Sequence, residues 1–313
     1  MRVIFMGSPE FAVPSLRGVV EAGHQVVRVV SQPDKPKGRG RSLAPCAVKE
    51  AALRLGLEVS TPDHIRGKHA VAFLDELHAL QPDVVLVAAY GKILSTRLLD
   101  MPRVAPINVH ASVLPRWRGA SPIQHAVLAG DDETGVSIMR MDAGLDTGGV
   151  YRVARTSILP NETAGELSTR LSVIGAAALV EALPAIADGS LVAQVQPEQG
   201  ITLAPLLDKH DGHLDFSLDA ASLVRRVHAM NPWPGASTRL DGKGLKIHRA
   251  HVVEANATEA APGALQVSHK ALLVRCGHGA LAIDELQLEG KRRLRSDEFL
   301  QGARIAPGTR LGE

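Results

Sequence analysis

The sequence is poor in aromatic residues and in cysteine. Aromatic residues make up 3% of the 313 residues, too few for stacking on rings to be a main means of binding. The two cysteines, Cys46 and Cys276, stand far apart, and neither belongs to a Cys/His cluster with zinc-finger spacing. A disulfide framework is therefore excluded, and both residues are expected to be free thiols in a reducing cytoplasm.

Long apolar runs and a large net charge are also missing. No window of about 18 residues is apolar and without a charge, and the first apolar run, residues 3–6, is too short for a signal peptide. These absences predict a cytoplasmic protein with no transmembrane helix and no membrane partner. Lys and Arg total 35 against 33 for Asp and Glu, so the charge of the whole chain gives no sign of a nucleic-acid partner.

Apolar strands alternate with helix-length segments in the first half of the chain. At about 150 residues per domain, the length suggests two domains. We predict strands at residues 2–6, 25–30, 83–88, 106–110 and 136–141, and helices at residues 15–22, 48–55 and 166–183, the last ended by Pro184. This alternation is typical of βαβ units. The fold class is therefore α/β, with a mostly parallel sheet in an N-terminal domain of residues 1–189.

The sequence pattern changes after a stretch that has no clear periodicity, residues 190–208, which we interpret as a linker. After a predicted helix at residues 220–228, short alternating segments such as 245–253 and 271–275 are divided by glycine-containing turns. This pattern predicts a small β-barrel in a second domain, residues 209–313.

A basic, Pro- and Gly-rich stretch follows the second predicted strand. Residues 33–42 favour a loop over a helix or a central strand. Between Gln32 and Lys49 the chain carries five cations and one carboxylate, a local net charge of +4. Two interpretations are open: a solvated surface loop, or a loop that grips phosphates with Arg and Lys while Gly lets the backbone approach closely.

Polar side chains gather where two predicted strands end. Asn108 and His110 lie two residues apart, so they point to the same face of the sheet. Asp142 and Asp146 follow the strand at residues 136–141 in a Gly-flanked loop, which we expect at the same edge of the sheet. An Asn can stabilise an oxyanion and a His can carry a proton, while an Asp can orient the His or hold a water. The set therefore suits acyl transfer to an amine. Direct transfer is favoured over a covalent intermediate, because no serine or cysteine fits a nucleophile elbow.

No group of His, Cys and carboxylate residues has the spacing of a metal site, so we expect no metal. Each of these polar residues could also be a hydrogen-bonded structural group.

Several segments of the chain resemble the methionyl-tRNA formyltransferase family. They are residues 5–11, 32–34, 38–40, 89–91, 108–110, 112–119, 141–148 and 231–234. The resemblance implies a Rossmann-like formyltransferase domain followed by an OB-like, tRNA-binding β-barrel. It also implies transfer of a formyl group from 10-formyltetrahydrofolate to the α-amino group of methionyl-initiator tRNA, for translation initiation. By the family's pattern, the catalytic residues are Asn108, His110 and Asp146.

The resemblance also implies which residues contact the two substrates. The folate is expected along Tyr90, Gly91, Ile93, Ser112, Val113, Leu114, Pro115 and Asp142. The tRNA is expected at Lys35, Lys37, Arg39, Arg41 and Lys209, with the cluster at residues 291–295 as further phosphate contacts. Arg116 and Arg118 could contact the terminal nucleotides or form structural ion pairs.

The sequence departs from the family's usual pattern at two positions. Ala111 stands where the family usually has Gly, and Leu206 stands where it usually has Lys. We expect a monomer. The alternatives are a folate-dependent formyltransferase acting on a small amine, such as an amino sugar or nucleotide, and a non-catalytic tRNA-binding protein.

Overall fold

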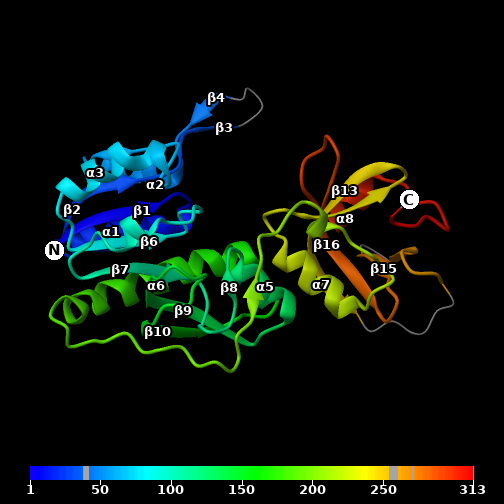
Figure 1. The fold of residues 1–313 in the computed structure, drawn as a ribbon. Helices are drawn as coiled ribbons and strands as arrows, with labels where there is room; N and C mark the ends of the chain where they lie inside the picture. Colours follow the sequence, from blue (N-terminus) through cyan, green and yellow to red (C-terminus); the bar gives the residue numbers. More distant parts are fainter. Residues whose placement is uncertain (38–41, 254–259, 269–270, 313) are drawn as a thin grey trace. The chain divides into compact units, whose positions relative to one another are not determined.

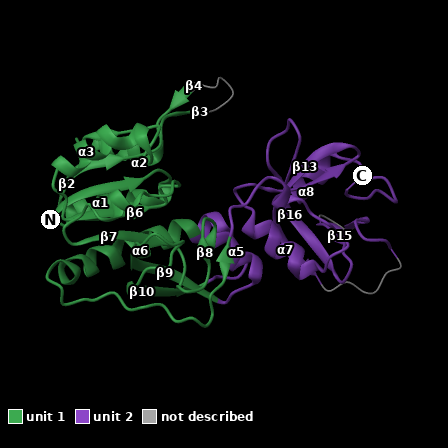
Figure 2. Cartoon of the chain, in the orientation of Figure 1, with its two compact units in different colours: residues 1–122, 133–157, 168–204 green, residues 123–132, 158–167, 205–313 purple. Residues whose placement is uncertain are grey.

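The computed structural model describes residues 1–37, 42–253, 260–268 and 271–312, which pack into two compact units (Figures 1 and 2). Unit 1 comprises Met1–Pro122, Glu133–Ser157 and Ser168–Ala204. Unit 2 comprises Ile123–Asp132, Ile158–Leu167 and Pro205–Glu313. Most of the stretch interpreted as a linker therefore packs within unit 1. The functional boundaries predicted at residues 189 and 209 stay predictions.

Unit 1 is built on a seven-stranded sheet in the order β10-β9-β7-β6-β1-β2-β5. Its strands are β1 (Arg2–Gly7), β2 (Gln25–Val30), β5 (Val59–Ser60), β6 (Val84–Ala88), β7 (Ala105–His110), β9 (Glu133–Arg140) and β10 (Val150–Ser157). All strand pairs from β5 to β7 are parallel. The strand β9 is antiparallel to both of its neighbours, β7 and β10. The predicted α/β class with a mostly parallel sheet is confirmed. Central strands such as β6 are apolar throughout because both faces of the sheet are covered.

One face of this sheet packs against α6 (Ala164–Ala187) and α1 (Val13–Glu21). The helix α6 comes so close that a Cβ added to Gly175 would stand 2.9 Å from Cγ1 of Val109 and 3.1 Å from Cγ1 of Val136. The predicted end of α6 before Pro184 is wrong, because the proline lies inside the helix. Because Pro184 lies near the C-terminal end of α6, it removes only one backbone hydrogen bond of the helix. The last turn still closes, with Asp188 N donating to Pro184 O over 3.1 Å.

The helix α6 is also long and apolar enough, by length and composition, to cross a membrane, contrary to the expectation that no such helix exists. Half of its most apolar stretch is buried within the protein. The core helix of a soluble domain passes the same test, so this feature is weak evidence for a membrane span.

The opposite face carries the apolar cluster formed with α3 (Val71–Ala79) and α4 (Thr96–Leu99). Ile4, Met6, Val85 and Val87 point into this cluster and are at most 6% exposed. Val87 pairs with both Met6 and Asn108, so Asn108 lies on this face, away from α6. Neither α3 nor β10 (residues 150–157) was predicted from the sequence.

The basic stretch forms a two-stranded hairpin outside the main sheet, from β3 (Lys35–Lys37) and β4 (Ser42–Ala44). An ion pair between Lys49 Nζ and Asp34 Oδ1, 2.8 Å apart, closes its base. Residues 38–41, which include Arg39 and Arg41, lie outside the described residues. Beside the hairpin's base, α2 (Ala47–Arg54) packs on α1.

Unit 2 contains an antiparallel sheet in the order β12-β13-β16-β15-β14, with β17 paired to β16. The strands are β12 (Ala236–Leu240), β13 (Lys243–Val253), β14 (Leu265–Ser268), β15 (Ala271–Arg275), β16 (Ala280–Leu288) and β17 (Leu294–Arg295), and its helices are α5 (Pro122–Ala129), α7 (Ala220–Ala229) and α8 (Ser296–Gly302). The helix α7 begins where the Asp219 carboxylate caps Ser222 N at 2.8 Å.

The chain's C-terminal segment joins the two edges of this sheet. Leu311 bridges Leu240 at the end of β12, and Arg310 bridges Ala264 beside β14. Leu311 N donates to Gly263 O over 2.8 Å, and Gly312 N donates to Arg239 O over 3.0 Å. The described part of unit 2 thus has the barrel-like, antiparallel character that the sequence predicted.

Candidate functional site

The site begins at the carboxyl end of β7, where Asn108 and His110 point to the same face. The His110 side chain is 5% exposed, while Asn108 is partly exposed. Among the described residues, none hydrogen-bonds the Asn108 carboxamide. An amide donor is therefore available at the strand end beside a buried imidazole.

Two contacts determine which nitrogen of His110 carries a proton. Nε2 lies 2.9 Å from the carbonyl oxygen of Trp117. Because a carbonyl oxygen only accepts, Nε2–H is the donor. Nδ1 faces the carboxylate of Asp146, with Oδ2 3.6 Å away. That separation is too long for a direct hydrogen bond.

Asp146 reaches His110 by a route that the sequence did not predict. The loop at residues 141–149 was expected at the same edge of the sheet as the end of β7. The two strand ends do not share an edge, because β9 is antiparallel to β7: Arg140 pairs with Ile107 and Ser137 with His110. Asp146 nevertheless lies beside His110, as expected. The loop instead returns toward His110 after leaving β9. Asp146 itself adopts a left-handed backbone, with φ 51°.

The Asp146 loop is held in place by hydrogen bonds rather than by apolar packing. Asp146 Oδ2 accepts from Gly119 N over 2.9 Å. The amide of Gln196 donates to the carbonyl oxygens of Asp146, over 2.8 Å, and Gly148, over 2.7 Å. Asp142 closes a local turn by accepting from Gly144 N at 3.0 Å and Thr147 Oγ1 at 2.7 Å. Its carboxylate is thereby engaged within the loop.

The loop after His110 is organised by two buried serines. Ser112 Oγ donates to Arg116 O over 2.6 Å. Ser137, in register with His110 on β9, donates to Ser112 O over 2.7 Å and accepts from Leu114 N over 3.1 Å. The side chains of Ser112 and Leu114 are buried. These two predicted folate residues therefore contribute to the loop's own structure; Val113 lies between them and Pro115 follows Leu114.

The residues that follow are tied to the chain just before Pro205. Trp117 N donates to Thr202 Oγ1 over 2.9 Å, and β8 (Arg118–Gly119) pairs with β11 (Leu203–Ala204). The Arg116 guanidinium lies 4.2 Å from the centre of the Trp117 ring, a cation–π contact. The Arg118 guanidinium donates to Gln196 Oε1, with Nη2 2.7 Å away. The partner of Arg118 is thus a neutral amide rather than the carboxylate of an ion pair.

The segment after β6 presents backbone rather than the Tyr90 side chain. Ala89 and Gly91 have φ of 46° and 77°. Tyr90 is 1% exposed within the apolar cluster, its hydroxyl has no hydrogen-bond partner, and burial raises its pKa to about 12. Its carbonyl oxygen accepts from Gln32 Nε2 over 2.9 Å. Ile93, by contrast, is 71% exposed.

The described tRNA candidates lie on exposed backbone segments of both units. Lys35 is exposed and donates to Gln32 Oε1 over 2.8 Å, Lys37 ends β3, and Lys209 is exposed. In the basic cluster at residues 291–295, Arg293 is paired with Glu285, and Arg295 lies 3.3 Å from Asp297. Part of that cluster's charge is thus neutralised within the protein.

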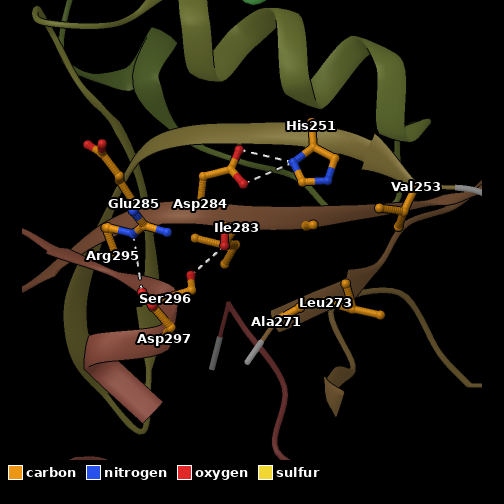
Figure 3. A pocket seen from close by; sticks show the side chains of 11 residues that line it. His251, Val253, Ala271, Leu273, Ile283, Asp284, Glu285, Arg295, Ser296 and Asp297 are labelled. Atoms are coloured by element: carbon orange, nitrogen blue, oxygen red, sulfur yellow. Dashed lines mark hydrogen bonds and ion pairs between the residues drawn. The ribbon is translucent and has the colours of Figure 1, made fainter. Parts of the chain in front are cut away.

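Unit 2 holds a separate hollow of about 420 Å³ between β13, β15, β16 and the start of α8 (Figure 3). His251 of β13 and Asp284 of β16 lie side by side at its wall, with Nδ1 and Oδ1 2.9 Å apart. It contains none of the predicted catalytic or folate residues. Across the described part of the chain, no group of three or more His, Cys, Asp or Glu side chains is arranged to hold a metal ion.

Three residues of this arrangement were missed by sequence reasoning: Ser137, Gln196 and Thr202. Ser137 interrupts an apolar strand, and that is a usable signal. Gln196 and Thr202 lie in a stretch without periodicity, where only the fold shows their partners.

Two family profiles match the chain. The profile described as "Formyl transferase" matches residues 1–183, and the profile described as "Formyl transferase, C-terminal domain" matches residues 206–304. The chain is 48% identical to the methionyl-tRNA formyltransferase of Myxococcus xanthus, covering 98% of this chain and 97% of that protein. It is 46% identical to that of Methylococcus capsulatus, covering 100% of both.

Solved structures share the fold. The methionyl-tRNA formyltransferase from Clostridium thermocellum aligns with a TM-score of 0.56 at 13% identity, over 81% of this chain and 94% of that one. HypX from Aquifex aeolicus in complex with tetrahydrofolic acid aligns with a TM-score of 0.64 at 18% identity, over 98% of this chain. This chain spans about half the length of HypX, 49%. At such identities the likeness shows the fold alone.

Proposed function

Since the chain belongs to the methionyl-tRNA formyltransferases of the formyl transferase family, we propose that it transfers a formyl group from 10-formyltetrahydrofolate to the α-amino group of methionyl-initiator tRNA, for translation initiation. The observation that carries the proposal is the unengaged Asn108 amide beside the buried His110 and the partly exposed Asp146, in a chain with full-length relatives of that activity. We propose direct transfer, with these three residues as the catalytic set.

Asn108 acts on the formyl oxygen. When the methionyl amine attacks the formyl carbon, negative charge develops on that oxygen. The Asn108 carboxamide, which no described residue engages, can donate a hydrogen bond to it. A donor already in place when charge develops costs no reorganisation and stabilises the transition state selectively.

His110 moves the proton at Nδ1. Its Nε2–H is committed to the Trp117 carbonyl, 2.9 Å away, so Nδ1 is the nitrogen free to take a proton from the attacking amine. The same atom can return that proton toward the folate nitrogen as it leaves. The Nε2 contact also fixes the orientation of the ring, so that Nδ1 faces Asp146.

Asp146 acts at Nδ1 of His110, the nitrogen that is proposed to take up and return the proton. Its Oδ2 stands 3.6 Å from Nδ1, a distance at which a carboxylate stabilises a protonated ring or binds a water that relays the proton. Asp146 is thus proposed to act as the orienting carboxylate, through charge or through one water, without a direct hydrogen bond in this structure.

The residues near the catalytic set suit the flat, polar ring of a folate. The chain turns at Ala89 and Gly91, which both have positive φ, and backbone groups within residues 87–93 can offer donors and acceptors to such a ring. We propose that they bind the folate together with exposed Ile93, the loop at residues 112–115 and the Asp142 turn. The Tyr90 contribution comes from its backbone, because its side chain is buried in the apolar cluster.

We propose that residues 1–189 form the catalytic domain, joined by residues 190–208 to a tRNA-binding domain of residues 209–313. The hairpin cations Lys35, Lys37, Arg39 and Arg41, together with Lys209, would bind phosphates. The scarcity of aromatic residues supports binding dominated by phosphate contacts rather than by base stacking.

The test is a formyl-transfer assay with the full chain. Labelled 10-formyltetrahydrofolate is mixed with methionyl-initiator tRNA, and formyl-methionine is recovered after deacylation. Parallel reactions contain uncharged initiator tRNA or a small amino sugar nucleotide. We expect label only with charged initiator tRNA. Label on the amino sugar alone would establish the small-amine alternative, and no label in any reaction would leave a binding protein.

A further inference from the structure

Gln196 occupies an unusual place for a residue in a stretch without helix or strand. Its side chain is buried, at 8% exposure, and its amide is fully used. Oε1 accepts from Arg118 Nη2 over 2.7 Å and from Arg118 Nε over 3.1 Å. Nε2 donates to the carbonyl oxygens of Asp146, over 2.8 Å, and Gly148, over 2.7 Å. A guanidinium on one side and two carbonyls on the other permit only this orientation of the amide.

The loop that carries Asp146 needs such a support. Gly144, Gly148 and Gly149 surround Asp146, and glycine leaves a chain with many accessible conformations. Asp146 itself has φ 51°, a left-handed conformation that surrounding contacts must hold for a residue other than glycine. Gln196 fixes the peptide groups after Asp146, while Gly119 N fixes its carboxylate at 2.9 Å.

Arg118 and Gly119 connect these two supports. The two residues are adjacent in β8, which pairs with Leu203 and Ala204 of β11. One therefore anchors Gln196 through its side chain, and the other holds the Asp146 carboxylate through its backbone. Together they form a closed set of hydrogen bonds around the loop. Neither Gln196 nor Arg118 contacts His110 in any hydrogen bond.

We propose that Gln196 is a positioning residue for formyl transfer: it holds the Asp146 loop, anchored by Arg118, so that the carboxylate faces Nδ1 of His110. This inference rests on the proposed function. A carboxylate displaced by about 1 Å costs up to about 100-fold in rate. Loss of Gln196 should therefore lower kcat by about 10- to 100-fold and leave the KM for folate and tRNA within about threefold, because Gln196 binds neither substrate.

The experiment is a double-mutant cycle on the full chain with Gln196→Ala, Asp146→Asn and the double variant. Gln194→Ala is the matched control, because that glutamine is exposed two residues away and its side chain bonds, among the described residues, only Val192 O, over 3.2 Å; its backbone bonds with Val150 do not depend on the side chain. If Gln196 acts through Asp146, the double variant should be no slower than Asp146→Asn. The proposal would be overturned if the fold-losses in kcat of the two single variants multiplied in the double variant. It would also be overturned if Gln196→Ala raised KM without lowering kcat.

Gln196→Glu keeps the test valid if the alanine variant fails to fold. Glutamate retains an oxygen for Arg118 but has no amide hydrogen for the two carbonyls. The proposal predicts that it loses kcat as the alanine variant does. A glutamate variant with the kcat of the unmodified protein would show that the contacts with the Asp146 loop are dispensable.

Amide hydrogen exchange separates this inference from the proposed function. The Gly119 amide is bonded to Asp146 Oδ2, so its exchange should rise about tenfold or more in Gln196→Ala and remain unchanged in Gln194→Ala. This readout needs no catalysis. Unchanged exchange in an active protein would refute positioning alone, whereas faster exchange in a protein that cannot formylate methionyl-tRNA would refute only the proposed reaction.

Discussion

Replacing Asn108 is the most direct test of how the site works. Its carboxamide bonds no described residue, and its backbone is paired with Val87 on one side and Met139 on the other. Asn108→Ala therefore removes a side chain without breaking any internal hydrogen bond and without freeing the strand. We expect its free energy of unfolding to remain within about 0.5 kcal/mol of the unmodified protein.

The expected kinetic effect follows from the role of a single donor to a developing oxyanion. Removal of one such donor costs about 10²- to 10³-fold in kcat, equivalent to about 2.7–4 kcal/mol of transition-state stabilisation. The substrate's neutral formyl oxygen gains much less from the same donor. The KM for 10-formyltetrahydrofolate should therefore change by less than about threefold.

The assay is single-turnover transfer of labelled formyl groups at saturating methionyl-tRNA. Asn108→Asp is the matched variant, since it keeps the shape but replaces the amide donor with an oxygen. It should be at least as slow as Asn108→Ala. Gln194→Ala serves as the control for substitution of an exposed amide elsewhere in unit 1. An Asn108→Ala variant that retains turnover within threefold of the unmodified protein would refute the assignment.

Four further outcomes follow from packing and charge. Gly175→Ala should gain about 1 kcal/mol from helix propensity and lose about 1–3 kcal/mol, because the new Cβ would stand 2.9 Å from Val109; denaturant unfolding that shows the whole gain would contradict the close approach. Tyr90→Phe removes a buried hydroxyl without a partner, so unfolding free energy at neutral pH should stay equal or rise by about 1 kcal/mol; a clear fall would reveal a partner. Deleting residues 309–313 removes the bridges to Leu240 and Ala264, so hydrogen exchange should accelerate in β12 and β14 but not in β6; uniform exchange would refute the closure. If five cations each neutralise one phosphate, the logarithm of tRNA affinity should fall with the logarithm of salt concentration at a slope of about −4; a flat titration would contradict phosphate-dominated binding.

The strands and helices that sequence predicted well are those whose burial is apolar. The strand β6 is apolar at every position because both of its faces are covered, and β2 and α7 match their predicted ranges to within a residue. In these segments the hydrophobic effect determines both the pattern and the structure, so the pattern is readable. The prediction that α6 ends before Pro184 failed, because the packing of the rest of the helix outweighs one lost hydrogen bond near its end.

Strand direction is a different kind of information. Both β7 and β9 read as buried strands, and nothing in their composition distinguishes a parallel from an antiparallel partner. The expectation that their ends share one edge of the sheet came from assuming a uniform parallel order. Asp146 was nevertheless expected near His110, and the two are 3.6 Å apart. The return of the loop, not the direction of β9, brings them together.

Residues 190–204 show why hydropathy fails to predict burial beside the Asp146 loop. Val195 is 91% exposed and Val192 is 64% exposed, whereas Gln196, which directly follows Val195, is 8% exposed. The order of burial is the reverse of the order of hydrophobicity. Such a reversal is stable only when the buried polar group has all its hydrogen bonds satisfied, since an unsatisfied amide costs more than the exposure of a valine. A segment that buries its glutamine and exposes its valines is therefore held by its partners, and here those partners are Arg118 and the backbone around Asp146. Its lack of periodicity is what a segment fitted to a polar loop, rather than to an apolar face, must show.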